Sequence, residues 1–178
     1  MKKLYIASLL FIGIASQAQT IGTSSLNPNS RWTFGGGAGI GFSGGSGGAG
    51  TSIGVTPRIG YRLTDNLEAG LAGSFTWMNS KYLSTSMVGV GPFANYYFGR
   101  SIYISGLFQQ YWINQKDKVY NQKYNTDEAA LYFGAGYMQR ISNGAYMQIG
   151  ASYNVLYKKE SSVFSSGFVP SIGFVFGL

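Results

Sequence analysis

The sequence predicts an all-β fold: an eight-stranded antiparallel up-and-down barrel that crosses a membrane, preceded by a cleavable signal peptide. Three observations support this prediction. Apolar residues alternate with small or polar residues in about eight segments, and a period of two is that of a β-strand. The connections between these segments are alternately long and short. After residue 18, no apolar run is long enough to form a membrane-spanning helix.

The alternation is clearest in residues 53–77, where two apolar stripes flank the turn Thr64-Asp65-Asn66. We expect a hairpin here, with a three-residue loop and Asn66 in the left-handed conformation. The opposite face holds glycines, small polar residues and only three charges, which is too few for a long solvated surface. A barrel in lipid explains this arrangement, because its apolar side chains point outward and its polar side chains point inward.

The other strands are assigned by the same parity rule. The expected strands cover residues 31–42, 53–63, 67–77, 86–98, 102–113, 129–141, 145–157 and 168–178. The two faces of segment 102–113 are similar in polarity. There, only an odd turn length selects the lipid-facing set, which is Ile102, Ile104, Phe108 and Trp112.

The connections predict which end of the barrel faces which compartment. Loops are expected at 43–50, 79–85, 114–128 and 158–163, and three-residue turns at 64–66, 99–101 and 142–144. Gly144 would occupy the left-handed position of the last turn. Membrane barrels have short periplasmic turns and longer outer loops. Both ends of the barrel domain are therefore expected on the periplasmic side.

Three regions are expected along the chain. Residues 1–18 have a basic start, a short apolar stretch and the small-x-small pattern Ser16-Gln17-Ala18, which indicates a signal peptide. Retention of this segment as a membrane anchor is the alternative. Residues 19–30 form a short polar lead-in, and residues 31–178 form the barrel domain.

Two stretches resemble a known family. Residues 56–67, Thr-Pro-Arg-Ile-Gly-Tyr-Arg-Leu-Thr-Asp-Asn-Leu, are similar to the second hairpin of small outer-membrane barrels of the OmpX/OmpA-barrel type, often called porin-family proteins. Residues 90–98, Val-Gly-Pro-Phe-Ala-Asn-Tyr-Tyr-Phe, resemble the fourth strand of that family. The resemblance covers residues 31–178. It implies a Gram-negative-type outer membrane and brings no shared catalytic residues.

The alternating aromatic C-terminus resembles the signal that the outer-membrane assembly machinery reads, which makes this machinery an expected partner during biogenesis. That signal usually ends in an aromatic residue, whereas this chain ends in Gly177-Leu178.

Composition argues against an enzyme and against a cofactor. The chain contains neither Cys nor His, which removes thiolate and imidazole chemistry and the usual zinc ligands. The six acidic residues fall mostly in turns and loops. Residues 39–44 fit G-x-G-x-x-G, but no helix follows them. The formal charge of +7 becomes +5 without Lys2 and Lys3, and no basic run indicates nucleic-acid binding.

Four charges are expected inside the barrel: Arg58, Arg62, Glu68 and Arg140. The hairpin register places Arg62 opposite Glu68, where opposite charges can interact. The alternative is that Arg62 reaches periplasmic water. Arg58 then lies opposite Ala72 and needs Glu68, a tyrosine such as Tyr132, or water, because an unpaired buried charge is costly.

Two further groups are candidates for contacts outside the barrel. Lys81, Lys158 and Lys159 lie near the expected outer boundary and are either contacts to lipid phosphates or solvated loop lysines. Loop 114–128 carries Tyr120 and Tyr124 among lysines. It either binds an extracellular partner or covers the barrel mouth.

The sequence therefore predicts a monomeric, non-enzymatic barrel with a structural or surface-interaction role through its outer loops. The alternative is a small porin or transport channel. Eight strands leave a lumen that side chains nearly fill, but the many inward glycines would widen it.

Overall fold

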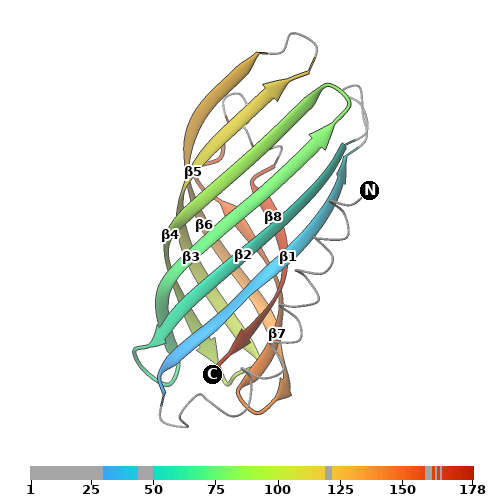
Figure 1. Cartoon of the computed structure of the whole chain (residues 1–178). Helices are drawn as coiled ribbons and strands as arrows, with labels where there is room; N and C mark the ends of the chain where they lie inside the picture. The colour runs from blue at the N-terminus through green and yellow to red at the C-terminus, as the bar shows by residue number, and fades with distance from the viewer. Residues whose placement is uncertain (1–29, 44–49, 119–121, 159–161, 163, 165) are drawn as a thin grey trace.

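The computed structural model describes residues 30–43, 50–118, 122–158, 162, 164 and 166–178. It is a closed barrel in which each strand pairs with its neighbours along the chain and β8 pairs with β1 (Figure 1). The strands are β1 (Trp32–Ser43), β2 (Gly50–Arg62), β3 (Leu67–Ser80), β4 (Leu83–Phe98), β5 (Ile102–Asp117), β6 (Lys123–Ser142), β7 (Ala145–Asn154) and β8 (Phe168–Phe176). The predicted eight-stranded antiparallel fold is confirmed.

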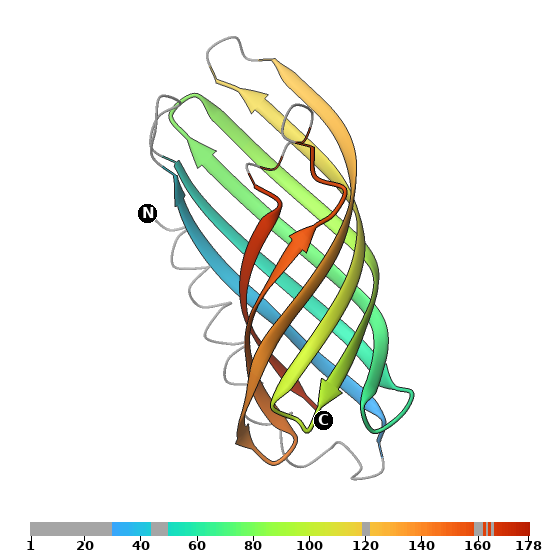
Figure 2. The same ribbon diagram turned by 180° about the vertical axis from the view of Figure 1, so that it is seen from behind.

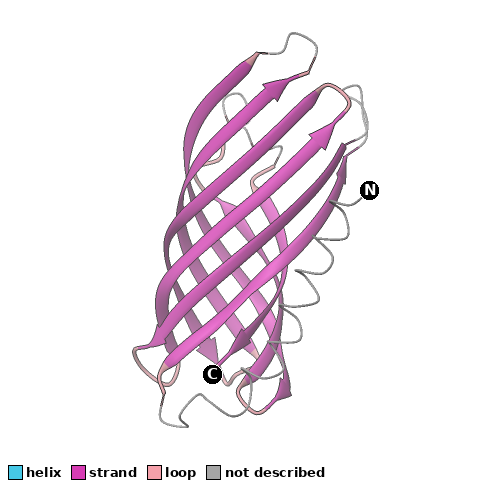
Figure 3. Cartoon of the chain, viewed as in Figure 1, coloured by secondary structure: helices cyan, strands magenta, loops and turns pink. Residues whose placement is uncertain are grey.

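Strands account for most of the described chain (Figure 3). They tilt strongly around the barrel, and the turns that follow β2, β4 and β6 lie at the same end as the C-terminus (Figure 2). No helix in the described ranges is long and apolar enough to cross a membrane. The predicted signal peptide 1–18 lies outside the described residues, and of the lead-in 19–30 only Ser30 is described.

The outer surface carries the predicted apolar stripes. In β5 the outward set is the expected one: Ile102, Ile104, Phe108 and Trp112 are 40–53% exposed. The residues between them include Tyr103, Gln109 and Tyr111, which are buried in the barrel. A surface with this much exposed apolar area is stable only against hydrocarbon. The alternation therefore shows which face meets lipid.

The hairpin between β2 and β3 has the predicted register, with Arg62 opposite Glu68 and Gly60 opposite Gly70. The predicted left-handed Asn66 is wrong, since Arg100 is the only described non-glycine residue with positive φ. The Thr64 hydroxyl instead accepts hydrogen bonds from the backbone N–H groups of Asn66 and Leu67. A side-chain turn of this kind replaces the left-handed residue. Gly144 has a φ of 72°, as predicted.

Two predicted outer loops are mostly strand. β3 and β4 leave only two residues between them, so the predicted loop 79–85 is wrong in extent. β5 and β6 pair up to Lys116 and Lys123, well into the predicted loop 114–128. The polar sequence there lacks the lipid-facing stripe, but backbone pairing continues without it. As a result, β5 and β6 project furthest from the barrel (Figures 1 and 2).

β7 is shorter than predicted: it ends at Asn154, whereas the predicted strand ends at residue 157. The Asn154 side-chain oxygen accepts hydrogen bonds from the backbone N–H groups of Leu131 and Leu156. This side chain takes the place of a ladder partner and turns the chain away from β6.

Candidate functional site

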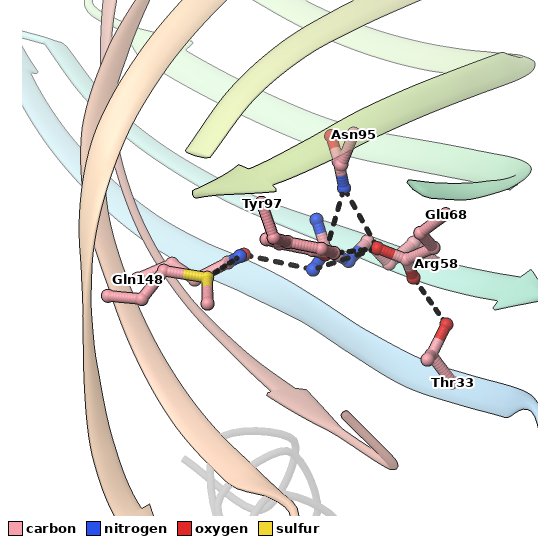
Figure 4. Close-up of polar contacts among 7 residues, drawn as sticks. Thr33, Arg58, Glu68, Asn95, Tyr97 and Gln148 are labelled. Carbon is pink, nitrogen blue, oxygen red and sulfur yellow. Dashed lines mark hydrogen bonds and ion pairs between the residues drawn. The ribbon is translucent and has the colours of Figure 1, made fainter. Parts of the chain in front are cut away.

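The lumen contains a buried polar cluster centred on Glu68, whose side chain is 0% exposed. Its carboxylate accepts hydrogen bonds from the hydroxyls of Thr33 and Tyr97 and from Asn95 Nδ2 at 3.0 Å (Figure 4). Arg58 Nη2 lies 4.0 Å from Glu68 Oε2. The carboxylate is thus held by three donors and one nearby cation, which is how a buried charge is made tolerable. We call these five residues the lumen plug.

Strand parity places the plug. Its members come from four adjacent strands, β1 to β4, and all lie on the inward parity. The register sets Glu68 beside Asn95 across β3 and β4. Gly60 makes room for the carboxylate, because a Cβ there would lie within 3.0 Å of both Glu68 and Thr33. A glycine at this position is therefore part of the plug's geometry.

Arg58 extends the plug to the opposite wall. Its Nη2 donates to Gln148 Oε1 at 2.9 Å, and its guanidinium carbon lies 5.4 Å from the centre of the Phe93 ring. The Nε atom of Arg58 is buried without a protein partner. Gln148 Nε2 in turn contacts Met138 Sδ at 3.1 Å (Figure 4). Arg58 therefore connects the plug across the lumen to Gln148 on β7, which contacts Met138 on β6.

A buried cluster that shares Tyr97 with the plug lies near the periplasmic turns. It consists of Tyr97, Tyr103, Met138, Tyr146 and Val175, all buried, with Leu178 packed against it. Together with the plug it places buried side chains across the lumen at this level.

Beyond the plug, on the extracellular side, the lumen opens into a cavity of about 230 Å³. Arg58, Asn95, Gln109 and Gln148 contribute polar groups to its lining, and Phe93 and Leu107 contribute apolar ones. Nearer the outer end, the Tyr111 hydroxyl donates to Gln109 Oε1. The cavity thus combines a polar floor that contains one cation with largely apolar walls.

The predicted lumen charges fall in three different places. Arg58 and Glu68 are together in the plug. Arg62 is opposite Glu68 on the backbone, but its Nη2 donates to the Ser30 carbonyl at 3.0 Å. Arg140 is exposed and binds the Ser142 carbonyl and the Asn143 side chain at a turn, not in the lumen. The expected contact between Arg62 and Glu68 is therefore replaced by one between Arg58 and Glu68.

Two of the three predicted lysines are described, and both are exposed. Lys81 is exposed, with its Nζ 5.2 Å from the centre of the Tyr82 ring. Lys158 is exposed as well, and Lys159 lies outside the described residues. Tyr124 is 53% exposed on β6, and Tyr120 is not among the described residues.

Sequence reasoning missed three members of the plug: Thr33, Asn95 and Tyr97. A signal was present, because the parity that points Ala94, Tyr96 and Phe98 outward also points Asn95 and Tyr97 inward. A polar residue on the inward parity at the level of Glu68 is a candidate partner for it. Among the described residues no group of three or more His, Cys, Asp or Glu side chains is placed to hold a metal ion.

Comparisons with known proteins give a likeness of fold only. No protein-family model matches the chain, and no curated protein matches its sequence. Neisserial surface protein A (NspA) superposes with a TM-score of 0.53 at 13% identity, over 84% of this chain and 98% of that one. The N-terminal β-barrel domain of Pseudomonas aeruginosa OprF superposes with a TM-score of 0.53 at 14% identity, over 83% of this chain and 97% of that one. The chain therefore has the fold of the small eight-stranded β-barrels of the bacterial outer membrane.

Proposed function

We propose that this outer-membrane barrel is a non-enzymatic surface-interaction protein that binds an extracellular partner through its projecting β5–β6 hairpin. The observation that carries the proposal is the unequal length of neighbouring strands. β6 starts at Lys123, but its ladder with β7 starts only at Tyr132. One further bond, from Val155 N–H to the Leu131 carbonyl, extends the contact by a single residue.

The first part of β6 is therefore a strand edge in water. Residues 123–127 are all exposed, and they pair with β5 on one side only among the described residues. A free edge presents backbone N–H and C=O groups that an extended segment of another protein can pair with. Lys116 and Lys123 lie directly opposite each other, which places two positive charges at the tip. We infer that the partner offers an extended segment with acidic side chains.

Adjacent prolines test the edge. Consecutive residues of a strand point their N–H groups to opposite sides of the strand. Of Asn125→Pro and Thr126→Pro, one therefore removes an outward donor, an N–H group on the free edge, and the other removes a ladder donor, an N–H group directed at β5. Intact cells that display each variant are incubated with an array of immobilised extracellular proteins. We expect at least one bound protein that is lost with the outward-donor variant and kept with Lys81→Gln. Equal binding by all variants, or no bound protein at all, contradicts the proposal.

The alternative function, a small pore, is less well supported because the plug and the buried cluster that shares Tyr97 with it place buried side chains across the lumen. We expect purified protein in planar bilayers to show no stable conductance steps. Tyr97→Gly, which removes the largest side chain of the plug, is the matched comparison. Steps from the wild-type protein of the same size as those from the variant would restore the pore interpretation.

A further inference from the structure

The barrel is closed by a short seam between β1 and β8. The described parts of these strands form four residue pairs, from Phe34 with Phe176 to Gly37 with Gly173. Residues 38–43 of β1 still pair with β2, and residues 168–172 of β8 still pair with β7, but they do not pair with each other. In Figure 2 the two strands diverge from the seam toward the extracellular end. We call the unpaired part the side opening.

The side opening faces the outer half of the membrane. A strand residue rises about 3.3 Å along the strand, or roughly 2.5 Å along the membrane normal at the usual tilt. Ala38 therefore lies about 15 Å above Trp32, within an apolar band about 25 Å tall. Strand edges are not tolerated against hydrocarbon unless they line a cavity that can satisfy their polar groups. Pro170 lies on this edge of β8 and has no N–H to satisfy.

A cavity of the required kind lies behind the opening. The lining of the lumen cavity includes Gly36, Gly37 and Gly173, the residues at which the seam ends. Glycine is required at Gly37 and Gly173, because a Cβ at either would meet backbone of the other strand within 2.8 Å. Beyond them, a Cβ at Gly39 would meet nothing within 4 Å. The seam is tight where it is closed and roomy where it opens.

The floor of this cavity carries a cation, Arg58, that makes few of the hydrogen bonds it could donate. Arg58 has five N–H donors, and the structure gives it one hydrogen bond, to Gln148. Its Nε is buried without a partner, and its contact to Glu68, at 4.0 Å, is longer than a hydrogen bond. Glu68 is occupied by Thr33 and by other plug donors. An anionic oxygen reaching the floor would therefore find N–H donors on the Arg58 Nη atoms that make no other hydrogen bond.

We propose that the cavity binds a single-chain amphiphile with a carboxylate head, which enters from the outer half of the membrane between β1 and β8. The carboxylate would bind Arg58, and the chain would lie along Phe93 and Leu107 toward the opening. Polar backbone edges on both sides of the opening give the head a path through the wall. A water-soluble anion has no reason to use a side opening that faces hydrocarbon, which is why the ligand is an amphiphile.

Photolabelling tests the proposal. The full barrel is reconstituted in zwitterionic phospholipid nanodiscs with a diazirine-bearing long-chain fatty acid, and in parallel with the methyl ester of the same acid. Adducts are mapped by mass spectrometry. Outward residues such as Leu71 and Ile149 should be labelled by both probes, because both dissolve in the bilayer. Inward residues Phe93 and Leu107 should be labelled by the acid well above the level seen with the ester.

A disulfide across the opening tests the route. Ala38 and Ile172 directly follow the last seam pair, Gly37 with Gly173, so they are the first two residues that face each other across the opening, and the chain has no cysteine of its own. Oxidised Ala38→Cys/Ile172→Cys should lose the inward adducts and regain them on reduction. The control pair, Val55→Cys/Phe75→Cys, bridges the closed β2–β3 ladder and should change nothing. Inward adducts that persist with the opening locked would overturn lateral entry, and their absence from the wild-type protein would overturn the site.

Arg58 variants test the head group. Arg58→Gln should lower inward labelling by the acid to the level of the ester, and Arg58→Lys, which keeps the charge, should retain the preference. Labelling of Leu71 reports that each variant is inserted. If Arg58→Gln keeps the full preference for the acid, the carboxylate site is wrong. This proposal does not depend on the β5–β6 hairpin, so its failure leaves the proposed surface interaction untouched.

Discussion

The periplasmic and extracellular halves of this lumen are built from the same strands but packed in opposite ways. In the periplasmic half, β1 and β8 are paired and Glu68 is surrounded by donors. In the extracellular half, the same two strands are unpaired and a cavity occupies the centre. One half therefore provides the closed ladder and buried charge network that stabilise the barrel, while the other leaves space and free polar groups. A binding function is expected in the second half.

The largest effect is expected from breaking the plug. Glu68→Ala leaves Arg58 as a buried charge without its counter-ion and removes the acceptor of three hydrogen bonds. Removing one partner of a buried ion pair costs about 3–5 kcal/mol of unfolding free energy. Urea unfolding in lipid vesicles measures this cost. Glu68→Gln keeps an acceptor and should cost less. A loss of less than about 1 kcal/mol for Glu68→Ala would mean that the plug stabilises the barrel no more than an exposed salt bridge does, which contradicts the prediction.

The second prediction compares lipid-facing positions. Leu71→Arg and Ile149→Arg should each cost about 2–4 kcal/mol near the bilayer midplane and about 0–1 kcal/mol near an interface. Ile172→Arg should cost less than Ile149→Arg, although the two residues are paired, because Ile172 borders the side opening and an arginine there can turn toward the cavity. Folding titrations in vesicles give the three values. Equal costs for the paired residues would mean that the wall at Ile172 is as closed as elsewhere.

The third prediction applies one substitution in both halves. Gly60→Ala places a methyl group against Glu68 and Thr33, and such overpacking costs about 1–3 kcal/mol. Gly39→Ala meets nothing within 4 Å, and restricting the unfolded chain should stabilise by about 0.4–1 kcal/mol. Urea midpoints of the two variants should therefore move in opposite directions. Similar shifts for both would contradict the difference in packing.

The smallest effect concerns which arginine is coupled to Glu68. A double-mutant cycle on Arg58→Gln and Glu68→Gln should give a coupling of about 0.5–3 kcal/mol, as for groups in one network. The cycle on Arg62→Gln and Glu68→Gln should give less than about 0.2 kcal/mol, below the range for directly opposed charges. The expected contrast follows from side-chain contacts, since backbone register favours Arg62. A larger coupling for Arg62 would reverse the assignment.

The sequence alone determined the barrel and its lipid face. Period-two alternation places side chains on two sides of a strand whatever the tertiary context, so the outward direction of Ile102 and Trp112 in β5 follows from parity and turn length. The hairpin register, with Arg62 opposite Glu68, followed from the same parity and a short turn. The outer ends of β5 and β6 were not predictable in this way, because above the membrane no lipid selects an apolar stripe.

Only the tertiary structure decided the interior and the closure. The partner of Glu68 depends on how far each side chain reaches across a narrow lumen. Such contacts also join residues from non-neighbouring strands, such as Arg58 and Gln148. The length of the β1–β8 seam depends on where two strands from opposite ends of the chain meet. Local sequence fixes which way a side chain points, because that is a property of one strand. It does not fix what the side chain meets, because that is a property of the closed barrel.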